Sequence, residues 1–165
     1  MRIAIVCVVP ILGLVGFLAK ELSEKWDVTQ SADRVLTIIE TAPLVSSLVH
    51  ELQRERGAST GFVSSKGQAL ADVMRNQRSV SDKAIAIWRQ KIGQIDQSSM
   101  GDKLVRTLDE AKSALASIAN TRANIDSLTI NGPQTAEYFT SIIGRFLSVA
   151  EETNNISNDA RIIRS

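Results

Sequence analysis

The sequence predicts an all-α protein in which a transmembrane helix precedes an up-down-up-down, antiparallel four-helix bundle. Of its 165 residues, 44% are hydrophobic, which is enough for the core of one domain. Aromatic residues make up only 4%, a low value for a β-rich core. Apolar residues recur at alternating spacings of three and four over long segments, which is the pattern of packed helices. These observations favour helices throughout.

The first segment has the features of a membrane span. Residues 3–19 carry no charge and lie between Arg2 and Lys20. As a helix they extend roughly 25 Å, the short end of the range for a transmembrane helix. We expect residues 1–20 to be an uncleaved signal anchor and residues 21–165 to form the helical domain that follows it. A cleaved signal peptide and a buried core helix stay open as alternatives.

The rest of the chain divides into segments of helical period separated by turn-forming residues. Breaks near Gly67, Gly101 and Gly132-Pro133 predict helices over 21–64, 68–97, 101–129 and 134–164. The connections are short, so sequential helices should be antiparallel neighbours.

Three arginines occupy positions in the apolar stripes, the helix faces on which apolar residues recur at spacings of three and four. Arg56, Arg78 and Arg122 lie ten or eleven residues from the turns at Gly67 and Gly132, which share one end of the predicted bundle. At about 1.5 Å per residue, all three should therefore lie at one depth, roughly 15 Å from that end. A charge inside a bundle is costly unless it is paired.

The surroundings of these arginines indicate a small anion-binding pocket. Small residues cluster on the first helix, and guanidinium groups supply planar arrays of donors. We expect Arg56, Arg78 and Arg122 to bind the anion, and Ser59, Ser81 and Phe139 to line the pocket. The alternative is structural ion pairing, because Asp82 and Asp126 each follow an arginine by four residues. In that alternative, Glu55 or Glu51 would neutralise Arg56 across the bundle. Two aspartates against three arginines would leave about one positive charge for a monoanion.

The composition excludes several functional classes. Lys and Arg total 19 and Asp and Glu total 18, so the net charge of +1 gives no basic surface for nucleic acid. The sequence has one cysteine, Cys7, and one histidine, His50, which excludes an intrachain disulfide and a Cys/His metal centre. No nucleophile–base pair appears. We therefore expect no enzyme, metal or cofactor.

One motif resembles a known family. Residues 48–67 read LVHELQRERGASTGFVSSKG, and further matching features are Gln77-Arg78 with Ser81-Asp82, Arg122 with Ile125-Asp126, and Tyr138-Phe139. Together they are similar to the NIT domain, named for nitrate and nitrite sensing, over roughly residues 35–150. The resemblance implies an all-helical, extracytoplasmic sensor in a bacterial receptor, with arginines that bind the anion. The arginines of the motif are the same three that the stripe spacing selects.

These observations lead to a functional expectation. We expect the ligand-sensing module of a signal-transduction receptor, held in the bacterial inner membrane by its N-terminal helix, with the bundle in the periplasm. Its expected partners are nitrate or nitrite, the membrane and a second copy of the chain. The alternatives are a bundle that senses a small carboxylate or amino acid, and a membrane-anchored helical stalk without a ligand.

Overall fold

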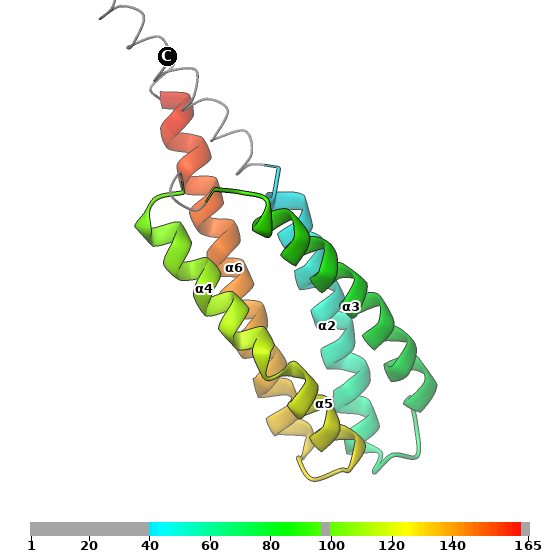
Figure 1. The fold of residues 1–165 in the computed structure, drawn as a ribbon. Helices are drawn as coiled ribbons and strands as arrows, with labels where there is room; N and C mark the ends of the chain where they lie inside the picture. Colours follow the sequence, from blue (N-terminus) through cyan, green and yellow to red (C-terminus); the bar gives the residue numbers. More distant parts are fainter. Residues whose placement is uncertain (1–39, 97–99, 163–165) are drawn as a thin grey trace, which may run out of the picture. The chain divides into compact units, whose positions relative to one another are not determined.

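The computed structural model describes residues 40–96 and 100–162, which lie in the second of two units of the chain, Thr37–Ser165. These residues form helices α2 (Ala42–Ser64), α3 (Ala71–Gly93), α4 (Asp102–Ala116), α5 (Ile118–Asp126) and α6 (Gly132–Ile162). Successive helices alternate in direction, and α4 and α5 follow one another along a single arm (Figure 1). The predicted all-α bundle is confirmed for the described residues.

The predicted signal anchor, residues 1–20, lies outside the described residues. Among the helices that the structure describes, none combines the length and the apolar composition needed to span a membrane.

Three of the predicted helices differ from the structure, and the second, expected over 68–97, is shorter at both ends, Ala71–Gly93. The first helix was expected over 21–64, but residues 40 and 41 form a turn and α2 begins at Ala42. Pro43 in the first turn explains this start, because proline has no N–H to donate and suits a helix beginning. The third helix was expected to be continuous over 101–129, but it is interrupted at Ser117.

Hydrogen bonds of two hydroxyl groups mark the interruption between α4 and α5. The Ser117 hydroxyl donates to the carbonyl oxygen of Ala114 at 3.2 Å and lies 3.1 Å from the Tyr138 hydroxyl of α6. A serine that bonds back to the preceding turn bends a helix. After the bend, α5 runs beside the N-terminal part of α6 (Figure 1).

The connections at one end of the bundle use specific local geometry. Asn131 and Gln134 exchange hydrogen bonds between their side chains and backbone N–H groups, each at 2.9 Å, which caps the start of α6. A Cβ atom on Gly132 would lie 2.6 Å from the Ser64 hydroxyl oxygen, so glycine permits the close approach of α6 to the end of α2. The turns after α2 and before α6 are therefore held side by side.

The core follows the predicted stripes. Apolar seam residues from all four arms are buried, among them Leu52, Ile85, Trp88, Leu108, Leu115, Ile125, Phe146 and Val149. The rings of Trp88 and Phe146 pack edge to face with centroids 4.8 Å apart. The stripes are less buried at the three arginine positions, since Arg56, Arg78 and Arg122 are only partly buried.

The helices do not approach one another equally. The backbone of α2 packs closely against α3 and α6, and α4 packs closely against α6. In contrast, α3 stays further from the arm formed by α4 and α5 (Figure 1). Long side chains therefore have to span the interface between α3 and the arm formed by α4 and α5.

Candidate functional site

The interface between α2, α3 and α5 contains a layer of ion pairs, which we call the arginine layer. It consists of Glu55, Arg78, Asp82, Arg122 and Asp126. Its members come from three helices, and its two arginines replace apolar residues in the stripes of α3 and α5. The arginines lie at one depth, as the counting from the turns predicts.

Glu55 is the centre of the layer. Its side chain is 0% exposed, and its two carboxylate oxygens accept from Nε and Nη2 of Arg122 at 2.7 and 2.9 Å. This two-point geometry matches the planar guanidinium and makes the pair stronger than a single hydrogen bond. The third donor group of Arg122, Nη1, binds Asp82 at 2.6 Å. Arg122 thus ties α5 to both α2 and α3.

Arg78 pairs across the same interface. Its Nη1 donates to both carboxylate oxygens of Asp126 at 2.9 Å each, and its Nη2 donates to the backbone oxygen of Arg122 at 3.4 Å. The alternative expectation, that each arginine pairs with the aspartate four residues later on its own helix, is wrong. Each arginine instead pairs with the aspartate of the other helix, Arg78 with Asp126 and Arg122 with Asp82. This occurs because α3 and α5 face one another with their arginines at the same depth.

Arg56 lies apart from the other two arginines. It is half-buried, and its Nη1 donates to the Thr140 hydroxyl of α6 at 3.1 Å. Within residues 40–96 and 100–162, Arg56 makes no ion pair. The stripe position assigned to Arg56 is occupied by Glu55, since the buried face of α2 passes through the preceding residue. The contact with Thr140 still places Arg56 at the predicted depth, beside Phe139.

The charge balance of the site differs from the sequence prediction. Two aspartates were expected to face three arginines and leave one positive charge. Glu55 supplies a third carboxylate, so the two arginines of the layer, Arg78 and Arg122, face three acidic groups. The guanidinium groups of the layer are therefore already engaged by carboxylates when no ligand is bound, and Arg56 lies outside these pairs.

The electrostatic surroundings hold Arg122 in its charged form. Burial by itself lowers the pKa of the guanidinium, but the hydrogen bonds and negative charges of Glu55 and Asp82 outweigh burial and raise the pKa above its ordinary value. Arg122 therefore remains a cation throughout the physiological pH range.

The three residues expected to line the pocket have different surroundings. The Ser59 hydroxyl is fully buried one helical turn after Glu55 and has no hydrogen-bond partner among the described residues. Ser81 is buried and donates to the backbone oxygen of Glu51 at 3.3 Å, so its hydroxyl is already used. Phe139 is fully buried in the core and packs edge to face against Tyr138. Of the three, Ser59 has a free polar group.

The small residues of α2 do not form the expected open pocket. A Cβ atom on Gly57 would meet nothing within 4 Å, because this residue faces outward. A Cβ atom on Gly61 would lie 2.5 Å from Leu70, so this glycine accommodates the turn after α2. The prediction that these glycines leave room beside the arginines is wrong.

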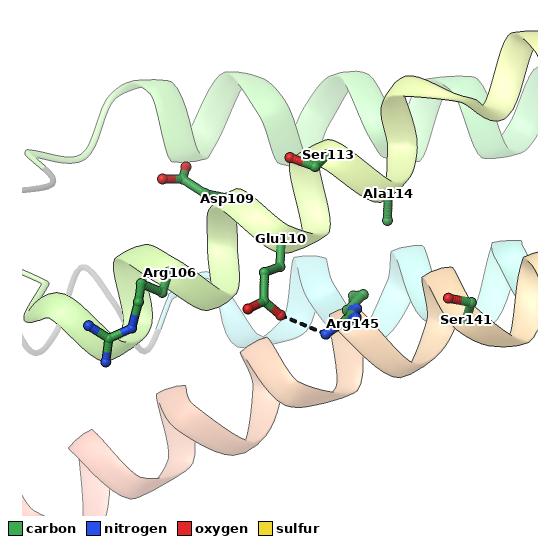
Figure 2. Close-up of a pocket in the computed structure, with 7 residues that line it drawn as sticks. All are labelled: Arg106, Asp109, Glu110, Ser113, Ala114, Ser141 and Arg145. Carbon is green, nitrogen blue, oxygen red and sulfur yellow. Dashed lines mark hydrogen bonds and ion pairs between the residues drawn. The ribbon is translucent and has the colours of Figure 1, made fainter.

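A hollow on the surface lies elsewhere, between α4 and α6 (Figure 2). Its volume is about 540 Å³, and its lining includes Arg106, Asp109, Glu110 and Arg145. Arg145 and Glu110 point toward one another across it and pair at 2.7 Å (Figure 2). All four charged residues are exposed and their charges balance, so the hollow has no built arrangement for one ligand.

Glu55 was considered in the sequence analysis only as a possible partner of Arg56, and its pairing with Arg122 was not predicted. The signal was present, since Glu55 follows Leu52 by three residues and precedes Ser59 by four, on one helix face. In the described parts of the chain, no group of three or more His, Cys, Asp or Glu side chains could hold a metal ion. The arrangement instead offers guanidinium donors and exchangeable carboxylate partners.

Comparison with known proteins assigns the family. The family model described as nitrate and nitrite sensing, NIT, matches residues 47–165. The match includes every residue of the arginine layer as well as Arg56 and Ser59. The chain belongs to the NIT family. Among curated proteins, none matches this NIT chain.

A solved structure supports the fold of this NIT domain. The structure of the NasR transcription antiterminator aligns with a TM-score of 0.72 and 23% sequence identity. The alignment covers 78% of this chain and 35% of the NasR chain, so the NIT chain spans about a third of that protein's length. At this identity the similarity establishes the helical architecture.

Proposed function

We propose that the bundle is the ligand-binding module of a bacterial signal-transduction receptor that detects nitrate or nitrite through the arginine layer. The observation that carries this proposal is that the NIT match over residues 47–165 spans the partly buried arginines of the arginine layer. The family match and the guanidinium donors between three helices both indicate the binding of a small anion.

Donor groups near the layer suit a small planar anion. Nε of Arg78 and the Ser59 hydroxyl are buried without a hydrogen-bond partner among the described residues. Arg56, whose charge no described carboxylate balances, lies on the α6 side of α2. We therefore keep Arg56, Arg78 and Arg122 as the anion-binding residues and Ser59 as a lining residue. Ser81 and Phe139 contribute by holding α3 and α6 in place.

The proposed signal is a change in helix position. An anion held by groups from α2, α3 and α5 alters the ties between these helices, and packed helices shift as rigid units. The proposal includes an N-terminal membrane anchor and a periplasmic bundle in a homodimer. It assigns no catalytic step to the bundle.

A second candidate function is a helical stalk without a ligand. The observation in its favour is that carboxylates already pair with both arginines of the layer, Arg78 and Arg122. A small carboxylate ligand on the same arginines is a variant of the sensor proposal, since carboxylate oxygens fit the same guanidinium donors.

Calorimetric titration of the full chain in a non-ionic detergent separates these functions. We expect saturable binding of nitrate or nitrite, with chloride, sulfate and acetate as competitor anions at constant ionic strength. Arg56→Gln should weaken nitrate binding about tenfold or more, because it removes a charged donor worth about 1.5–3 kcal/mol. This variant leaves no buried carboxylate unpaired, so it should fold like the wild type.

Arg54→Gln is the matched control, because Arg54 is exposed on the same helix two residues earlier. It should bind nitrate as the wild type does. Tighter binding of acetate than of nitrate would assign a carboxylate ligand. No heat and no thermal stabilisation by any anion, with a folded protein, would support the stalk.

A further inference from the structure

The carboxylate of Glu55 occupies the donor groups that an anionic ligand would use. It engages Nε and Nη2 of Arg122 at 2.7 and 2.9 Å, and it is completely shielded from water. A carboxylate and a nitrite ion each present two oxygens on one planar centre, and nitrate presents three. All of them match the same fork of guanidinium N–H groups. Glu55 is therefore the chemical equivalent of a ligand attached to the protein.

A second arrangement of Glu55 is within reach. Its Oε1 lies 4.0 Å from Nε of Arg78, which is buried and has no hydrogen-bond partner among the described residues. A hydrogen bond needs about 2.7–3.2 Å, so a movement of about 1 Å completes this contact. In that arrangement Glu55 pairs with Arg78, and the Nε–Nη2 edge of Arg122 becomes open to another anion.

From this geometry we infer that Glu55 is a built-in competitor that sets the affinity of the anion site, and that nitrate or nitrite binds to Arg122 as Glu55 moves to Arg78. The inference rests on the proposed function and adds its regulation. In the unliganded protein Glu55 ties α2 to α5 through Arg122. In the liganded protein the same carboxylate ties α2 to α3, so that ligand binding exchanges one helix contact for another.

The exchange accounts for a site whose guanidinium groups are occupied by carboxylates when no ligand is bound. Without Glu55, Arg78 and Arg122 would keep only Asp126 and Asp82 as partners, and the Nε–Nη2 edge of Arg122 would be open to small anions. With Glu55 in place, a ligand must compete with an internal carboxylate, so only an anion that fits the guanidinium edge closely can displace it. The affinity measured from outside is reduced by the fraction of molecules in which that edge is free.

Removal of the competitor is the direct test. We titrate the full chain, wild type and Glu55→Gln, with sodium nitrate and sodium nitrite in non-ionic detergent at constant ionic strength. When the open arrangement is about a tenth of the population, the variant should bind about tenfold more tightly than the wild type. Its melting temperature should also rise more steeply with nitrate concentration.

Glu51→Gln is the matched control. Glu51 lies one turn earlier on α2, and its carboxylate binds Gln77 at 2.7 Å and not an arginine. This variant also removes one negative charge, but its nitrate affinity should stay within about twofold of the wild type because the charge is more distant from the site. Glu55→Asp, which keeps the charge and shortens the side chain, serves if Glu55→Gln does not fold. It should bind nitrate more tightly than the wild type, by a smaller factor.

The possible outcomes separate this inference from the proposed function. Tighter binding by Glu55→Gln, or binding by this variant alone, supports the built-in competitor. Binding by the wild type with equal or weaker binding by the variant overturns the inference and leaves the anion sensor in place. No binding by either folded protein contradicts both.

Discussion

The molecule contains two arginine–glutamate pairs with the same length and different surroundings. Arg122 and Glu55 pair at 2.7 Å with side-chain exposures of 13% and 0%. Arg145 and Glu110 pair at 2.7 Å in the hollow of Figure 2, with both side chains 53% exposed. Water screens the second pair, whereas the first has been removed from water at a cost that its hydrogen bonds must offset. Burial, and not distance, therefore decides which pair has the larger effect on the free energy of unfolding.

Breaking the buried pair should have the largest effect on stability. Arg122→Ala leaves the Glu55 carboxylate shielded from water with no bonded cation, and the free energy of unfolding should fall by about 3–5 kcal/mol. Urea unfolding followed by circular dichroism measures the loss.

Removing both partners sharpens this comparison. Arg122→Met combined with Glu55→Leu leaves no unpaired charge at the centre of the layer, because Asp82 is exposed to solvent. The double variant should recover most of the stability lost by Arg122→Ala. A double variant as unstable as the single one would mean that Glu55 does not depend on Arg122, and the contrast between the two pairs would fail.

Breaking the surface pair should have the smallest effect. Arg145→Ala should change the free energy of unfolding by less than about 0.5 kcal/mol, because both side chains are solvated. The change should shrink further when the urea titration is repeated at about 1 M salt, where charges are screened within about 3 Å. A loss comparable to that of Arg122→Ala would show that distance alone governs these pairs.

Most of the fold was accessible from the sequence. The alternation of three and four residues selected core residues such as Trp88 and Phe146, and the turns at Gly67 and Gly132 fixed which helix ends meet. The interruption at Ser117 was not accessible, because it depends on a hydroxyl contact with Tyr138 from a distant segment. Pro43, by contrast, was a legible signal for the start of α2.

The candidate site was predictable in position and not in pairing. Counting residues from the turns placed three arginines at one depth, since the rise of a helix is fixed. Which carboxylate pairs with which arginine depends on how α3 and α5 face each other, and that depends on the packing of the whole bundle. The buried face of α2 passes through Glu55 instead of Arg56, a shift of one residue that changes the charge of the site.

The most direct test of the account is a crystal structure of the chain grown with sodium nitrate. The account predicts a planar anion on the Nε–Nη2 edge of Arg122, with the Glu55 carboxylate moved to within hydrogen-bonding distance of Nε of Arg78. A structure with Glu55 still paired to Arg122 in two-point geometry, and with nitrate absent from the arginine layer or bound elsewhere, would contradict it.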